Sequence, residues 1–150
     1  GIPTSTLEND LETMRLNSAA RVSYAHGWLF QPYPGTELGQ FTEENHLMAG
    51  TLDDIGEVAW DHSILVFPSE DDRRQREHFQ RLFALGVEFP RLEGLILKLI
   101  KLPHNKLVDT VFWWFHKLHK GFAIYFRVYP FRPGPIELVK TALHFMRIKS

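Results

Sequence analysis

The sequence of 150 residues predicts an α/β fold in which a strand, a tight loop and a helix precede a mostly helical second half. Bulky and small side chains alternate over residues 20–31, which predicts a strand because the two faces of a strand alternate. Pro32, Pro34 and Gly35 then end that strand abruptly. From Ser69 onward, apolar residues recur at the three- and four-residue spacing of amphipathic helices.

The N-terminal part is expected to hold two helices. Ser5 and Glu8 have the spacing of a capping box, which predicts a helix over about 6–17. Thr36 is a suitable N-cap for a helix that reaches about residue 46. We expect two side chains of this second helix to face the core, Leu38 and Phe41. Residues 47–62 are expected to form a loop with a solvated acidic face, made by Asp53, Asp54, Glu57 and Asp61.

The second half is expected to form helical hairpins. Ser69 precedes three acidic residues, which favour a helix start, and Gly86 is the expected stop of that helix near Leu85. Three more helices are predicted at 91–101, at 107–119 with Gly121 as C-cap, and from Pro135 onward. Two short segments remain open: 63–67 as a short strand or extended connector, and 122–130 as a strand or irregular crossing.

Charge divides the chain into two unlike halves. Residues 1–90 hold 15 acidic and 6 basic side chains, whereas residues 91–150 hold 3 acidic and 11 basic ones. The basic half predicts a surface that faces anions, a membrane or nucleic acid, or else attraction between the two halves within the fold. The aromatic run 112–115, flanked by lysines, is either core or an interfacial helix face, since Trp113 and Trp114 cannot point to the same side. The flanking lysines are Lys106, Lys117 and Lys120.

Composition excludes several chemistries. There is no cysteine, which excludes disulfides, zinc–thiolate sites, a cysteine nucleophile and cysteine-ligated iron–sulfur clusters within these residues. His116 and His119 have a spacing that can bind a metal, but their neighbours on the helix are lysines, so we expect no metal ligand in the chain. No purely apolar run is longer than the one at 111–115, which is far short of a membrane span. Because the chain starts without Met, we expect it to be a piece of a longer protein.

Two motifs resemble one enzyme superfamily. Gly1-x-Pro3-x-x-Thr6-Leu7-Glu8 and Gln31-Pro32-Tyr33-Pro34-Gly35-Thr36-Glu37-Leu38 resemble, in order and spacing, the radical S-adenosylmethionine superfamily, in its branch with a cobalamin-binding domain. The resemblance covers residues 1–48 and extends less specifically to 67–70 and 102–106.

This resemblance implies a fold and a set of cofactors. Residues 1–48 would be the last strands and helices of a partial (β/α) barrel, 49–68 a connector, and 69–150 an α-helical C-terminal extension. The complete enzyme would use S-adenosylmethionine, a [4Fe–4S] cluster whose ligands lie outside this chain, and cobalamin. The chain alone would be inactive. Gly1 and Pro3 would close a turn beside the cofactor, and Leu29, Phe30 and Gln31 would lie at the adenine.

The function expected from the resemblance is radical hydrogen abstraction or cobalamin-assisted methyl transfer. The partners would be a small-molecule or lipid-like substrate, the rest of the barrel and possible peripheral membrane contact, in a cytoplasmic enzyme that binds no nucleic acid. The alternative is a non-catalytic, basic and aromatic helical module that binds a membrane surface or an anionic partner.

Overall fold

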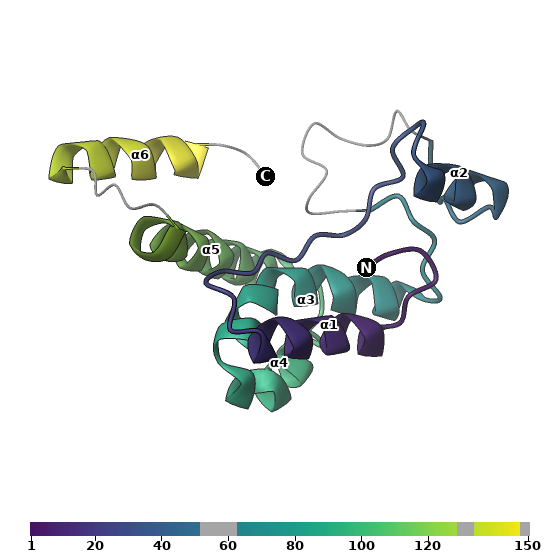
Figure 1. Cartoon of the computed structure of the whole chain (residues 1–150), viewed down its shortest axis with the longest axis horizontal. Coiled ribbons are helices and arrows are strands. Elements are labelled where there is room, and N and C mark those ends of the chain that lie inside the picture. The colour runs from purple at the N-terminus through teal and green to yellow at the C-terminus, as the bar shows by residue number, and fades with distance from the viewer. Residues whose placement is uncertain (52–62, 129–133, 148–150) are drawn as a thin grey trace.

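The regular structure of the chain is helical (Figure 1). The computed structural model describes residues 1–51, 63–128 and 134–147. The predicted α/β fold, and with it the fragment of a (β/α) barrel, is wrong: within these ranges no strand or sheet forms. Residues 63–67, for which the sequence allows a short strand or an extended connector, form no strand. Leu65 makes only an isolated antiparallel bridge with Met48. The four acidic residues predicted to form a solvated face lie outside the described residues.

The longest helix, α3 (Glu70–Glu88), lies at the centre of the molecule. Helix α1 packs along α3, and α4 and α5 pack on it as well. Two helices stand away from this centre at opposite ends of the view, α2 and α6 (Figure 1). The bounds of the other helices are Leu7–Ala19 for α1, Glu37–Glu44 for α2, Glu93–Leu99 for α4, Lys106–Ala123 for α5 and Pro135–Arg147 for α6.

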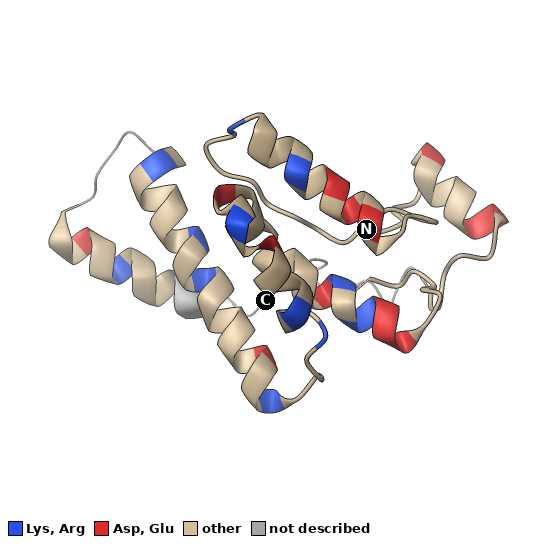
Figure 2. Ribbon diagram, turned by 90° about the horizontal axis from the view of Figure 1, so that it is seen from below, with Lys and Arg blue, Asp and Glu red and all other residues tan. Residues whose placement is uncertain are grey.

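The core lies where these helices meet. Its buried members come from α1, α3, α4, α5 and the extended segment after α1, and they include Leu11, Met14, Ala25, Phe79, Leu82, Phe83, Val87, Ile96, Ile100 and Phe112. The charge division found in the sequence is visible in the ribbon: acidic residues mark α1, α2 and the start of α3, and basic residues recur along α5 (Figure 2). No described helix combines the length and the apolarity needed to cross a bilayer.

The predicted strand at 20–31 fails because its backbone groups bond to other partners. Helix α1 continues to Ala19, and the chain then runs extended without a neighbouring strand. The backbone N–H of Leu29 donates to the side chain of Gln80, at 3.1 Å, and that of Phe30 donates to the carbonyl of Gly1, at 3.1 Å. The side chains of residues 20–31 do alternate between two faces. The inner face of this segment packs against helix α3 and belongs to no sheet.

Helix starts follow the predicted capping chemistry closely. Thr36 and Ser69 are N-caps as predicted, each accepting a hydrogen bond from the backbone three residues on. The cap of α1 is Thr6 rather than Ser5, because Thr6 and Asn9 form the capping box. The predicted inward orientation of Leu38 and Phe41 is wrong: both are exposed, and Gly39 and Thr42 are the buried residues of α2.

Helix ends were predicted less well. Helix α3 continues through Gly86 and α5 continues through Gly121, so neither glycine is a C-cap. Residues 124–128, expected to be a strand or a crossing, continue α5 as a π-helical turn. The predicted helix at 91–101 is a short 3₁₀ turn at Pro90–Leu92 followed by α4.

Gly86 has a packing reason to lie inside a helix. A Cβ atom built there would lie 2.2 Å from the sulfur of Met14 and 3.1 Å from Ile96 Cδ1. Met14 and Ile96 are fully buried, so any shift of these side chains has to be accommodated within the core. Gly86 therefore allows α1 and α4 to approach α3 closely.

We predict that Gly86→Ala lowers the free energy of unfolding by about 1–3 kcal/mol, because overpacking a filled core outweighs the better helix propensity of alanine. The measurement is urea unfolding followed by circular dichroism. Gly121→Ala is the matched control, since Gly121 is also helical but a Cβ there meets nothing within 4 Å. The control should be neutral or stabilising by up to about 1 kcal/mol. Equal effects of the two changes would contradict the packing role.

Candidate functional site

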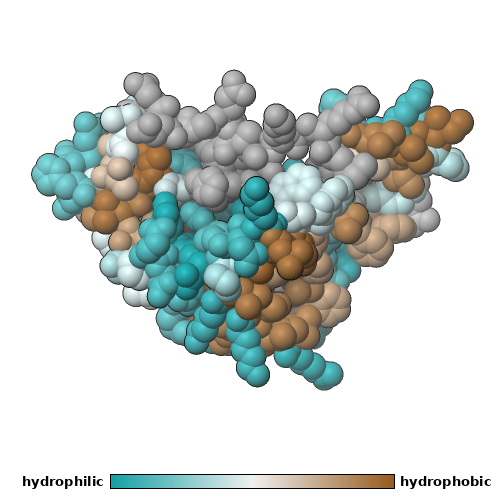
Figure 3. All heavy atoms as spheres, turned by 180° about the vertical axis from the view of Figure 1, so that it is seen from behind, coloured by the Kyte–Doolittle hydropathy of each residue, from teal (hydrophilic) through white to brown (hydrophobic). Residues whose placement is uncertain are grey.

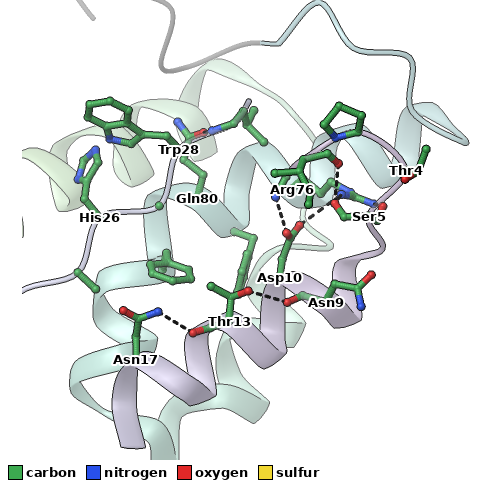
Figure 4. Close-up of a pocket in the computed structure, with 18 residues that line it drawn as sticks. Thr4, Ser5, Asn9, Asp10, Thr13, Asn17, His26, Trp28, Arg76 and Gln80 are labelled. Atoms are coloured by element: carbon green, nitrogen blue, oxygen red, sulfur yellow. Dashed lines mark hydrogen bonds and ion pairs between the residues drawn. The ribbon is translucent and has the colours of Figure 1, made fainter. Parts of the chain in front are cut away.

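A pocket of about 640 Å³ lies between the N-terminal loop, α1, the extended segment and α3 (Figure 4). This volume is within the range of about 300–1,000 Å³ that is usual for small-molecule sites. Its walls come from three stretches that are distant in sequence: residues 1–17, 25–29 and 76–83. The polar residues that line it include Thr4, Ser5, Asn9, Asp10, Thr13, Asn17, His26, Arg76 and Gln80.

Arg76 fixes one end of the pocket. Its side chain is buried, with 2% exposed, and its Nη1 donates to Ser5 Oγ at 2.9 Å and lies 3.3 Å from Asp10 Oδ2. Nη2 donates to the backbone carbonyl of Ser5, and Nε donates to Asp72 Oδ2 at 2.8 Å. One guanidinium therefore connects α3 with both the N-terminal loop and α1 (Figure 4).

Gln80 fixes the extended segment, one turn further along α3. Its Oε1 accepts the backbone N–H of Leu29 at 3.1 Å in a buried setting. The neighbouring N–H of Phe30 donates to the carbonyl of Gly1, and a Cβ added to Gly1 would meet Leu29 Cδ2 at 2.9 Å. The N-terminal loop and the extended segment are therefore held side by side at the pocket wall.

The wall from α1 is a polar stripe of Asn9, Thr13 and Asn17. These residues recur every four positions, which places them on one face of the helix. Thr13 Oγ1 donates to the carbonyl of Asn9 at 2.9 Å, and Asn17 Nδ2 donates to the carbonyl of Thr13 at 2.8 Å. The hydroxyl oxygen of Thr13 and the amide oxygen of Asn17 can also accept hydrogen bonds from a ligand.

Two aromatic rings complete the pocket. His26 and Trp28 meet edge to face, with ring centroids 5.3 Å apart, and Trp28 is 60% exposed. Burial lowers the pKa of His26 to about 3, with further lowering by the charges of Lys120 and His116. At neutral pH this side of the pocket is therefore lined by an uncharged imidazole and an indole.

The structure brings together most of the residues predicted to bind the cofactor. Gly1, Pro3 and Leu29 line the pocket. Phe30 contributes the backbone bond to Gly1, whereas Gln31 is buried and is not among the lining residues.

Sequence reasoning missed the polar stripe of α1 and the two α3 residues, Arg76 and Gln80. The stripe had a signal, because Asn9, Thr13 and Asn17 are four residues apart in a predicted helix. No local pattern indicates that Arg76 and Gln80 reach back across more than 50 residues, from α3 to Ser5 and Leu29.

The two histidines considered as metal ligands, His116 and His119, contact different groups of α3. His116 Nδ1 lies 3.4 Å from the carbonyl of Arg81, and His119 Nε2 lies 2.9 Å from Glu88 Oε2. Comparisons with family models, curated proteins and solved structures gave no match to this chain.

Proposed function

We propose that the chain is part of a radical S-adenosylmethionine enzyme and that its pocket receives the adenosyl portion of that cofactor. The described residues form no barrel that could support this proposal, so it rests on the motif residues and on the pocket that they line. The observation that carries it is the hydrogen bond from Phe30 N–H to the Gly1 carbonyl. It joins Gly1 of the first motif to Phe30, the residue directly before the second motif, and it does so at the wall of the pocket.

The pocket suits a nucleoside in its chemistry. Hydroxyl and amide groups of Thr13 and Asn17 can bond the ribose hydroxyls and the exocyclic amine of an adenine, and Trp28 offers an aromatic face to a base. The neutral state of His26 avoids a like charge beside the sulfonium of S-adenosylmethionine. In that family, S-adenosylmethionine supplies a 5′-deoxyadenosyl radical when it is cleaved reductively. This chain would bind and orient the nucleoside.

The residues of this chain do not fit an iron–sulfur cluster. A [4Fe–4S] cluster of this kind needs cysteine thiolates, and the sequence contains none. In our proposal the cluster ligands and the cobalamin site belong to other parts of the enzyme. Hydrogen abstraction and methyl transfer remain alternative outcomes for the complete enzyme, with a small-molecule or lipid-like substrate.

We predict that the chain binds 5′-deoxyadenosine and that Asn17→Leu weakens this binding at least tenfold, or about 1.4 kcal/mol. The substitution removes an amide at the pocket wall and leaves a buried ligand group without a partner. Isothermal titration calorimetry with 5′-deoxyadenosine and with S-adenosylmethionine measures the effect.

Asn45→Leu is the matched control for this experiment. Asn45 also donates its amide to the carbonyl four residues earlier, at 2.8 Å as in Asn17, but it lies at the end of α2. The control should bind like the unaltered chain. Absence of saturable binding, or equal weakening in both variants, would contradict a nucleoside site in this pocket.

A second candidate function rests on the outer face of α5. Its side chains at Leu107, Val111, Trp114 and Leu118 are 75, 54, 41 and 66% exposed, and their spacing places them on one face. Seen from behind, hydrophobic side chains form a continuous exposed area beside a hydrophilic one (Figure 3). Lys117 lies next to this face, with its ammonium 5.3 Å from the centre of the Trp113 ring.

We propose that this face of α5 rests on an anionic membrane surface. An exposed apolar stripe beside lysines is the pattern of an interfacial helix. The occupant is a lipid surface rather than a protein, because Lys106 and Lys117 flank the stripe and each surface lysine can contribute about 1 kcal/mol at an anionic bilayer.

We predict that the chain co-sediments with vesicles containing phosphatidylserine and that salt weakens this association. Changing Lys106 and Lys117 to Glu should weaken it at least tenfold, by the loss of about 1 kcal/mol for each lysine. The control changes Lys98 and Lys101 to Glu, near the end of α4. Partitioning that ignores lipid charge, salt and the α5 lysines would reject the membrane role.

A further inference from the structure

Two histidines and an aspartate meet on the side of α3 that faces α5. His78 comes from α3, His104 from the turn that follows α4, and Asp109 from the first turn of α5. His78 Nε2 lies 3.4 Å and His104 Nδ1 lies 2.7 Å from the same oxygen, Asp109 Oδ1. All three potential ligand atoms lie within 4.8 Å of one another.

The other nitrogen of each ring is already bonded to an acceptor. His78 Nδ1 lies 3.2 Å from the carbonyl of Ile100, which can only accept, so Nδ1 carries the proton there. His104 Nε2 lies 3.1 Å from the carboxylate of Glu77, which is nearly fully buried. Metal-binding histidines are commonly oriented in this way, with the second ring nitrogen donating to a carbonyl or carboxylate.

The number of protons makes this cluster unusual. A neutral imidazole carries one N–H, and in each ring that proton is used on Ile100 or Glu77. The remaining nitrogens, His78 Nε2 and His104 Nδ1, then direct lone pairs at the oxygen of Asp109. Three lone-pair donors that converge in this way are stabilised by a positive charge, which either a bound cation or an additional proton supplies. Arg81 Nη1 approaches the same carboxylate oxygen, at 3.5 Å.

We infer that His78, His104 and Asp109 bind a divalent first-row transition-metal ion such as Zn²⁺. Imidazole and carboxylate ligands suit these ions, whereas Mg²⁺ and Ca²⁺ prefer oxygen ligands only. Zinc bonds of about 2.0–2.1 Å give ligand separations of about 3.3 Å in a tetrahedral site. The 3.4 Å between His78 Nε2 and Asp109 Oδ1 matches this separation, whereas His104 Nδ1, at 2.7 Å from the same oxygen, has to move outward when the ion binds.

The site is built around one rigid ligand and two adjustable ones. His78 is fully buried, whereas the side chains of His104 and Asp109 are 33 and 35% exposed and can shift to complete the coordination. This exposure leaves the fourth position open to water. The ion would join α3 to the start of α5, on the side of α3 away from the nucleoside pocket, so the inference stands independently of the proposed function.

The test is titration of the tag-free chain with Zn²⁺ by calorimetry, with Co²⁺ absorption as a report on nitrogen ligands. We expect one Zn²⁺ per chain and no comparable binding of Mg²⁺. His104→Gln and Asp109→Asn should each weaken Zn²⁺ binding at least tenfold, and Glu77→Gln should weaken it tenfold to a hundredfold through the orientation of His104.

His119→Gln is the matched control, because His119 pairs with a carboxylate, Glu88, outside the three-ligand cluster. It should bind Zn²⁺ like the unaltered chain. Circular dichroism verifies that each variant is folded, which the partial exposure of His104 and Asp109 favours. Failure of the unaltered chain to bind Zn²⁺, equal affinity in the ligand variants, or equal binding of Mg²⁺ would overturn the inference. In the first case the cluster is a hydrogen-bonded network without a metal ion.

Discussion

The arrangement of the N-terminal half depends on the buried guanidinium of Arg76. A buried charge is tolerated only when it is paired and its donors are satisfied, and Arg76 meets this condition through Asp72, Asp10 and Ser5. Because the guanidinium is planar and rigid, these bonds fix the loop before α1 relative to α3 in direction as well as in distance. The ring of Phe67, whose centre lies 5.5 Å from the guanidinium carbon, covers it further. Arg76 holds this loop on α3 at one end of the pocket, and the bond from the Phe30 N–H to the Gly1 carbonyl joins it to the extended segment.

Helix α3 carries two different surfaces as a consequence. Arg76, Gln80 and Phe83 face the pocket, whereas His78 and Arg81 face α5. Both surfaces bury polar side chains, and Arg76, His78 and Gln80 satisfy them with hydrogen bonds to other segments of the chain. The two proposed ligand sites therefore share one rigid element, which is the favourable placement for binding groups.

The sequence allowed the helices to be predicted better than their relation to one another. Caps at Thr36 and Ser69 are local, since a side-chain oxygen accepts a backbone N–H three residues away, and such signals can be read directly. The prediction that Gly86 ends α3 is wrong because the reason for this glycine is its contact with Met14 of α1, a helix that is distant in sequence. The segment 20–31 was misread as a strand because alternation indicates an extended chain with one buried face, and a helix can cover that face as well as a sheet can. The motif resemblance pointed to Gly1, Pro3 and Leu29, which line the pocket, and their role in binding a cofactor stays a prediction. The contacts of Arg76, His78 and Gln80 depend on tertiary packing that no local pattern encodes.

The most direct test of the role of Arg76 compares Arg76→Gln with Arg73→Gln in urea unfolding. Both arginines lie on α3 and pair with an acidic residue of the same helix, but Arg73 is 44% exposed and Arg76 is 2% exposed. Removing one partner of a buried pair costs about 3–5 kcal/mol, whereas an exposed pair contributes about 0–1 kcal/mol. We predict a loss of free energy of unfolding in the first range for Arg76→Gln and in the second for Arg73→Gln. Equal losses in the two variants would contradict the claim that Arg76 holds the pocket together.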